Sequence, residues 1–242
     1  MSMEIRSQRV LVWWALLGTV VYGLCMFFLW HMMPPPSPQW SAERIAQFYQ
    51  EHSTQVRIGA MIAGWTSAFF LALTVVIAIQ MRRIERGPVW TMVTLAAGAL
   101  TTVYLTLPPI CWGVAAYTPT RSPEITATFH EFGVLTVITT DQYFVFMWVA
   151  IIVICLTPTK VAASPFPRWF GYFSAWCCLI FEAGAVAFLP RTGPFAWNGL
   201  LAFWVPFSVF GAWMIIVAVL LLKALKAQAQ EEESVDSKLI DA

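Results

Sequence analysis

The stretch from Phe129 to Cys155 reads FHEFGVLTVITTDQYFVFMWVAIIVIC and indicates what class of protein this is. As a helix rising 1.5 Å per residue, it is long enough to cross a bilayer core about 30 Å thick. Yet it opens with His130 and Glu131 and carries Asp141 in its interior. A charged residue at that depth costs roughly 2.5–3.5 kcal/mol, so a membrane helix that keeps one gives it a partner or a task.

The composition of the whole chain also indicates a membrane protein. Of its 242 residues, 59% are hydrophobic and 11% are charged, whereas soluble domains are about 25% charged. A formal net charge of +1 offers no basic surface for nucleic acid, which excludes that class of partner. The five cysteines all lie in apolar runs without a C-x-x-C pair, so we interpret them as buried free thiols.

The hydropathy pattern predicts an all-α polytopic bundle of six transmembrane helices, with one membrane domain over residues 1–226. The spans are expected at about residues 10–30, 58–80, 89–117, 132–156, 169–189 and 197–222. Two adjacent prolines, Pro108 and Pro109, are expected to kink or break the third span near its far end. Residues 227–242 are charged and are expected to form a disordered cytoplasmic tail.

Between the first two spans, the segment 41–52 has a Ser N-cap and an apolar stripe. This pattern predicts a short amphipathic helix on the outer surface of the membrane or across the end of the bundle. Aromatic residues near the ends of the spans, at Trp40, Trp169 and Trp197, are interpreted as anchors at the membrane interface.

The distribution of Lys and Arg predicts the orientation, because cytoplasmic loops carry the excess of positive charge. With the N-terminus inside, ten basic residues fall on the inner side: Arg6, Arg9, Arg82, Arg83, Arg86, Lys160, Arg168, Lys223, Lys226 and Lys238. Four fall on the outer side: Arg44, Arg57, Arg121 and Arg191. We therefore predict that both termini lie in the cytoplasm.

The candidate functional residues gather in the outer half of the predicted bundle. Asp141 and Glu182 lie on consecutive spans at similar depth, and two carboxyls in a low dielectric have their pKa values pushed apart, as an acid and a base require. Helical spacing puts His130 on the face of Asp141. A polar band at membrane depth is typical of a cavity, here one open to the outside. The candidate catalytic residues are Asp141 and Glu182, and the candidate ligand-binding residues are His130, Glu131, Gln142 and Tyr143.

Alternative roles remain open for these residues. Asp141 fits a structural carboxyl bonded to a neighbouring span, a proton or ligand site in a carrier, or a general acid or base in an enzyme. The three histidines on the outer side, His31, His52 and His130, are candidates for a haem or transition-metal site. Because no H-x-x-x-H or H-E-x-x-H pattern occurs, histidines at the membrane interface are the simpler interpretation.

Several loop and interface segments resemble those of an uncharacterised family of bacterial six-pass integral membrane proteins of about this length. The similar runs cover nearly the whole chain: MMPPPSPQWSAERIAQFYQEH (32–52), VRIGAMIAG (56–64), AIQMRRIE (78–85), RSPEIT (121–126), FPRWFGYFSAW (166–176) and RTGPFAWNGLLAFWVP (191–206). None is a catalytic motif. The resemblance therefore implies a fold and a membrane location, and no activity.

The leading functional hypothesis is a protein in the lipid bilayer whose outward-facing polar cavity binds a small, mostly apolar molecule, as a carrier or sensor. A second hypothesis is an intramembrane enzyme of the isomerase, lyase or oxidoreductase type that uses Asp141 and Glu182 as acid and base. A third is a membrane subunit without chemistry of its own. In each case a homo-oligomer or a larger membrane complex remains open.

Overall fold

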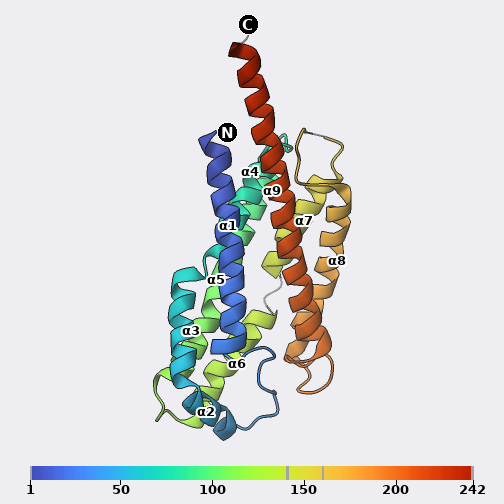
Figure 1. Ribbon diagram of the computed structural model, residues 1–242. Coiled ribbons are helices and arrows are strands. Elements are labelled where there is room, and N and C mark those ends of the chain that lie inside the picture. Colours follow the sequence, from blue (N-terminus) through green and yellow to red (C-terminus); the bar gives the residue numbers. More distant parts are fainter. Residues whose placement is uncertain (1, 140–141, 160, 241–242) are drawn as a thin grey trace.

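The computed structural model describes residues 2–139, 142–159 and 161–240, and in this part of the chain all regular secondary structure is helical (Figure 1). The α-helices are α1 (Met3–Leu24), α2 (Ala42–Glu51), α3 (Ser53–Thr66), α4 (Phe69–Arg82), α5 (Val89–Tyr117), α6 (Pro123–Thr139), α7 (Gln142–Leu156), α8 (Arg168–Ala185) and α9 (Val205–Ile240). Two π-helical segments, η1 (Cys25–Leu29) and η3 (Leu200–Trp204), and the 3-10 turn η2 (Val186–Phe188) complete them.

Six helical segments of the described chain are long and apolar enough to cross a membrane, which confirms the predicted all-α bundle. They are Met3–Leu29, Ser53–Arg82, Val89–Tyr117, Pro123–Leu156, Arg168–Phe188 and Leu200–Ser234. Most are longer than predicted, because helices continue beyond the apolar run into polar flanks. At the start of α1, for example, the Ser2 hydroxyl accepts a hydrogen bond from the Ile5 N–H at 3.4 Å and caps the helix.

The packing places α5 at the centre, against α3, α4, α6 and α7. Helix α1 packs against α4 and α9, and α8 packs against α7 and α9, which closes the bundle. Figure 1 shows the N- and C-terminal helix ends together at one end of the molecule and α2 across the other. We refer to these as the terminal end and the α2 end. The predicted amphipathic helix is thus confirmed as α2, with Ser41 as its N-cap.

Helix α5 runs without a break from Val89 to Tyr117 through Pro108 and Pro109, so the break that the sequence suggests does not occur. Since Pro109 has no N–H, the carbonyl of Leu105 loses its regular helical donor. The hydroxyl of Tyr22 on α1 donates to this carbonyl at 2.9 Å. A neighbouring helix therefore satisfies the backbone group that the proline leaves open, as the membrane interior requires.

Two other expectations differ from the structure. Where the sequence suggests a disordered tail from residue 227, α9 continues as a helix to Ile240. The side chain of Glu232 accepts hydrogen bonds from the backbone N–H and the hydroxyl of Ser2, at 2.8 and 2.9 Å, and so attaches this extension to α1. Trp197 is 7% exposed and donates its indole N–H to the Pro36 carbonyl at 2.7 Å, so it is a buried loop anchor and does not face lipid.

Candidate functional site

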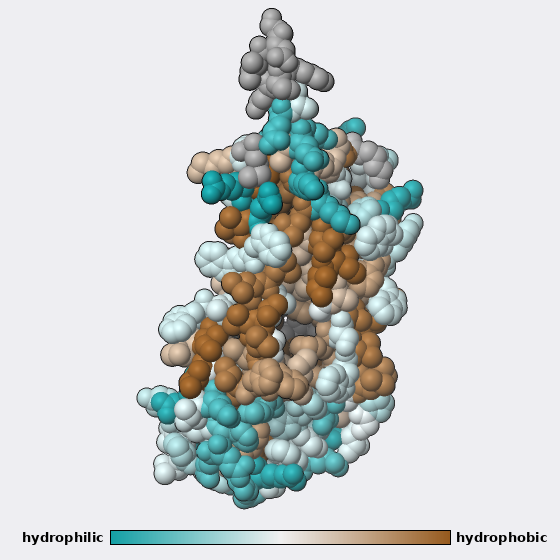
Figure 2. All heavy atoms as spheres, in the orientation of Figure 1, coloured by the Kyte–Doolittle hydropathy of each residue, from teal (hydrophilic) through white to brown (hydrophobic). Residues whose placement is uncertain are grey.

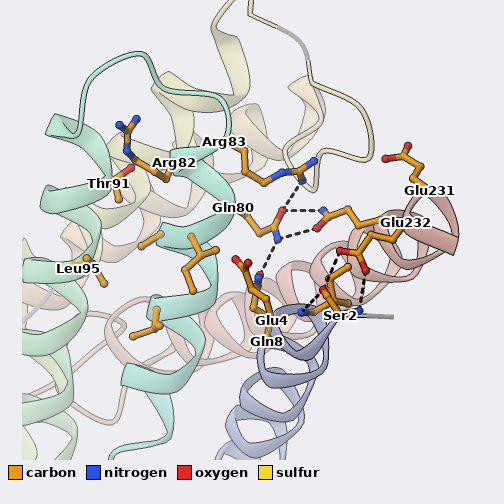
Figure 3. Close-up of a pocket in the computed structure, with 15 residues that line it drawn as sticks. Ser2, Glu4, Gln8, Gln80, Arg82, Arg83, Thr91, Leu95, Glu231 and Glu232 are labelled. Carbon is orange, nitrogen blue, oxygen red and sulfur yellow. Dashed lines mark hydrogen bonds between the residues drawn. The ribbon is translucent and has the colours of Figure 1, made fainter. Parts of the chain in front are cut away.

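The largest hollow lies at the terminal end and has a volume of about 1190 Å³ (Figure 3). In its wall, Gln80 of α4 joins side chains from α1 and α9. Its Nε2 donates to Gln8 Oε1 at 2.8 Å, and its Oε1 accepts from Gln228 Nε2 at 3.0 Å. Arg83 donates to the same Gln80 oxygen at 2.8 Å and to the carbonyl of Ala162 at 3.0 Å.

The amides of this network already satisfy one another. Gln8 and Gln80 are buried, and buried polar groups in proteins are normally hydrogen-bonded. Here the partners come from helices that are distant in sequence. The network therefore connects α1, α4 and α9 mechanically. The predicted site residues do not include it, and its signal in the sequence was Gln80 within the apolar run 69–81.

A second hollow, the central cavity, lies in the middle of the bundle and has a volume of about 250 Å³. Figure 2 shows the surface hollowed between α1 and α9, within the brown hydrophobic band. The cavity wall includes Tyr22 and Met26 on the α1 side and Pro206 on the α9 side. Six phenylalanines also line it: Phe69, Phe144, Phe181, Phe203, Phe207 and Phe210. The hollow therefore opens towards lipid and has an aromatic wall.

The polar side chains in the described wall of the central cavity are bonded to backbone. Thr19 donates to the carbonyl of Ala15 at 2.8 Å, and Tyr22 donates to the carbonyl of Leu105. A hydroxyl used in this way is held in place and does not serve as an acid or base. Within the described residues, the cavity is thus suited to bind an apolar molecule.

Of the predicted carboxyl pair, Asp141 and Glu182, the structure describes only Glu182. Asp141 lies outside the described residues, whereas Ile138 before it and Phe144 after it both line the central cavity. Glu182 lies on the exposed side of α8 and accepts a hydrogen bond from Gln142 Nε2 of α7 at 3.3 Å. The structure therefore brings two predicted site residues together, Gln142 and Glu182. The pairing of Glu182 with Asp141 stays a prediction.

Tyr143 contacts α5. Its ring stacks on Tyr104, with ring centroids 4.9 Å apart and planes at 25°, and the two hydroxyl oxygens lie 3.4 Å apart. This contact holds α7 against α5 close to the junction between α6 and α7. A ligand-binding role for Tyr143 stays a prediction.

A third cavity, also about 250 Å³, lies at the α2 end, and we refer to it as the α2-end cavity. His130 and Glu131 of α6 line it, which brings together two of the predicted ligand-binding residues. Ser41 at the start of α2 contributes a hydroxyl, and Arg191 after α8 contributes a cation. The wall thus combines a cation, a carboxyl and an imidazole.

His130 is fully buried, and its Nδ1 lies 2.9 Å from the hydroxyl of Tyr49 on α2. Burial raises the pKa of Tyr49 well above its ordinary value, so the phenol keeps its proton. Among the described residues, Nδ1 is the one recorded partner of this hydroxyl, which therefore donates to Nδ1. The imidazole proton then lies on Nε2, which has no hydrogen-bond partner among the described residues.

Tyr49→Phe tests this assignment. The protein has three histidines, so ¹⁵N labelling of histidine gives three resolvable imidazoles. We expect the His130 ring of the wild type to be neutral, with its proton on Nε2. The variant loses the donor to Nδ1, so we expect the tautomer preference to weaken and the free energy of unfolding to fall by about 1–3 kcal/mol. Ring ¹⁵N shifts measure the tautomer, and His130→Gln assigns the signal. A wild-type proton on Nδ1 would contradict the assignment.

The three histidines do not form one group in the structure. The rings of His31 and His52 are in contact at the α2 end, with centroids 4.4 Å apart and planes tilted by 58°. His52 Nδ1 donates to the carbonyl of Phe48 at 2.9 Å, whereas His130 is bonded to Tyr49. In the part of the chain that the structure describes, no three His, Cys, Asp or Glu side chains are arranged to hold a metal ion. The described cysteines are free thiols, as predicted.

Comparison with protein-family models, with curated proteins and with solved structures gives no match for this chain. The resemblance to six-pass bacterial membrane proteins therefore stays a prediction. What the protein does has to be inferred from its own cavities.

Proposed function

We propose that this membrane protein binds a small, mostly apolar molecule in the central cavity, as a carrier or sensor. The observation that supports this function is the aromatic-lined hollow in the middle of the bundle, open between α1 and α9. Its volume of about 250 Å³ is just below the roughly 300–1,000 Å³ of cavities for drug-sized ligands, so the molecule is small.

The bilayer constrains which molecule would be selected. A ligand dissolved in lipid gains no hydrophobic energy by moving into a protein cavity, because lipid tails are equally apolar. Selectivity has to come from close packing and from contacts with aromatic faces. Phe144, Phe181 and Phe210 pack around one another with ring centroids 5.1–6.3 Å apart, and such clusters favour a planar ring. We therefore propose a ligand with an unsaturated or aromatic ring.

The route into the cavity would pass between α1 and α9. Both sides of this opening have irregular helix: η1 follows α1, and η3 precedes α9, in which Pro206 is the second residue. Single π-helical turns occur frequently at functional sites, because their extra residue widens the turn. Irregular segments on both sides of the opening would let it widen without disturbing the packing of α5.

The predicted enzyme differs from this proposal in needing an acid and a base. The hydroxyls in the described wall are bonded to carbonyls, so binding is the better-supported function. Catalytic roles for Asp141 and Glu182 stay predictions. We further propose that the terminal end is cytoplasmic, because ten of the fourteen Lys and Arg residues are expected on that side. The resemblance to six-pass bacterial proteins supports the proposal that the membrane is a bacterial inner membrane.

Gly211→Leu tests the proposed binding. Gly211 lines the central cavity, and a Cβ at this position meets no atom within 4 Å, so a leucine fills the cavity without a clash at its base. We expect at least a tenfold loss of saturable labelling by a photoactivated phenyl-diazirine probe. Mass spectrometry of peptides that contain Tyr22 and Phe207 measures the labelling, with the protein reconstituted in bilayers.

Two further variants make this test specific. Gly23→Leu fills the cavity from the α1 side and should have the same effect. Gly64→Leu on α3 is the matched control, because its Cβ also meets nothing within 4 Å and it lies on the exposed surface. Labelling that never saturates in the wild type, or that survives in both cavity variants, would show that the central cavity does not bind the probe.

A further inference from the structure

The exposed side of α7 and α8 carries a carboxyl group in an otherwise apolar surface. Glu182 is the only charged residue in the sequence between Arg168 and Arg191, and its side chain is exposed. Among the described residues, its recorded partner is Gln142, at 3.3 Å. The bond is long and involves one carboxyl oxygen, so most of the hydrogen-bonding capacity of the carboxyl group remains unused.

The depth of Glu182 makes this exposure costly. The residue lies fourteen positions after Arg168 and six before Phe188, the two ends of its membrane-spanning segment. At 1.5 Å per residue, it is about 21 Å from one end and about 9 Å from the other. A glutamate side chain is too short to reach water from that depth. Intramembrane carboxyls normally face protein or a water-filled cavity, which indicates that something other than lipid covers this one.

Gln142 and Glu182 form a self-complementary pair. They lie side by side on two adjacent antiparallel helices, with the donor on α7 and the acceptor on α8. A rotation of 180° about an axis along the membrane normal places Gln142 of one copy opposite Glu182 of another. The same rotation places Glu182 of the first copy opposite Gln142 of the second, as a two-fold interface requires.

The unused groups of the pair match across that axis. The Gln142 amide has two N–H donors, and the observed bond to Glu182 uses one of them. Within the described residues the second N–H has no recorded acceptor, so it can donate to the carboxyl group of a facing copy. Two amides and two carboxyl groups can therefore form one closed set of hydrogen bonds, which a single copy of the chain does not complete.

The residues around the pair are large and apolar. Phe146 lies one turn after Gln142 on α7 and is 57% exposed. Leu179 lies one turn before Glu182 on α8 and is 75% exposed, and Val186, the first residue of η2, lies four positions after Glu182 and is 36% exposed. Residues three or four positions apart share a helix face, so these side chains surround the polar pair on the same surface. Against a second copy, they would exclude lipid and water from the hydrogen bonds.

We propose that two copies of this chain associate in the membrane through the exposed faces of α7 and α8, with Gln142 of each copy hydrogen-bonded to Glu182 of the other. Neither Gln142 nor Glu182 is among the described residues that line the central cavity. Association and ligand binding are therefore separate properties, and each can fail without the other.

The test counts copies per particle in bilayers. The full-length protein, fused to a fluorescent protein at its C-terminus, is reconstituted at low density, and photobleaching steps are counted for single particles. We expect two-step bleaching for the wild type. Glu182→Leu and Gln142→Leu each remove one side of the hydrogen-bonded set, so we expect the dimer fraction to fall at least tenfold at equal density.

Two controls separate hydrogen bonding from a general effect of substitution. Glu182→Gln keeps an amide that both donates and accepts, so this variant should remain dimeric. Glu124→Leu, an exposed glutamate in the first turn of α6, should also remain dimeric. Thermal unfolding of the detergent-solubilised variants confirms that each is folded. One-step bleaching of the wild type, or a folded Glu182→Leu and Gln142→Leu that both remain dimeric, overturns the proposal.

Discussion

Gln80→Leu is expected to lower the free energy of unfolding by about 4 kcal/mol, the largest effect of any single substitution that we predict. The side chain is 1% exposed and bonds to Gln8, Gln228 and Arg83 at 2.8–3.3 Å. Leucine retains the apolar volume but leaves Gln8, which is buried, and Gln228, which is half-buried, without their partner on α4. A buried polar group left unpaired costs roughly 1–3 kcal/mol, and the lost bond to the half-buried Gln228 adds to the cost at Gln8. Unfolding in detergent, followed by circular dichroism, measures the loss.

Two further variants test whether unpaired hydrogen-bonding groups cause the loss of stability in Gln80→Leu. Gln47→Leu changes an exposed glutamine on α2 whose side chain donates to Glu51, and it should change stability by less than about 0.5 kcal/mol. Replacing Gln8, Gln80 and Gln228 together by leucine removes the donors along with the acceptors, so it should recover most of the loss. If the triple variant is less stable than Gln80→Leu, the hydrogen bonds themselves hold the helices together.

Gly98→Ala is expected to lower the free energy of unfolding by about 3 kcal/mol. Gly98 lies where α5 crosses α4, and a Cβ built on it overlaps the Cβ, Oγ1 and Cγ2 atoms of Thr74. Thr74 has no room to move, because it is fully buried and its hydroxyl donates to the Phe70 carbonyl at 2.8 Å. One extra methyl group in a packed interior costs about 1–3 kcal/mol, and the rigid neighbour places this site at the upper end.

Gly64→Ala on α3 is the matched control, since its Cβ meets nothing within 4 Å. An alanine there should be neutral, or stabilising by up to about 1 kcal/mol, because alanine favours the helix. Thr74→Ala combined with Gly98→Ala should recover part of the loss, because it removes Oγ1 and Cγ2, the two nearest of the three atoms that the new methyl group overlaps. Equal stability of Gly98→Ala and Gly64→Ala would show that α4 and α5 separate without cost.

The architecture could be predicted from local features of the chain. Six apolar runs of sufficient length predict six spans, because the bilayer thickness sets how many residues a helix needs. Ser41 predicts the start of α2, since an N-cap depends only on the backbone within one turn. The predicted pair of Asp141 and Glu182 on consecutive spans stays a prediction, and the observed bond from Gln142 to Glu182 was not part of it.

The positions of partners could not be predicted in this way. Pro109 reads as a helix breaker, yet Tyr22, which lies 83 residues before Leu105, supplies the missing hydrogen bond. Three histidines on one side suggest one site, yet His130 is bonded to Tyr49, whereas His31 and His52 contact each other.

The membrane-spanning character of the chain is therefore a local property, set by how many apolar residues follow one another between polar flanks. The polar network of Gln8, Gln80 and Gln228 and the central cavity are not local. They depend on which helix faces come together, and residues as far apart as 148 positions meet there. Hydrophobic periodicity specifies that a face is buried, whereas the packing of the whole bundle selects its partner. The apolar stretch from Phe129 to Cys155 thus predicted a membrane-spanning helix, whereas the central cavity beside it results from the packing of the whole bundle.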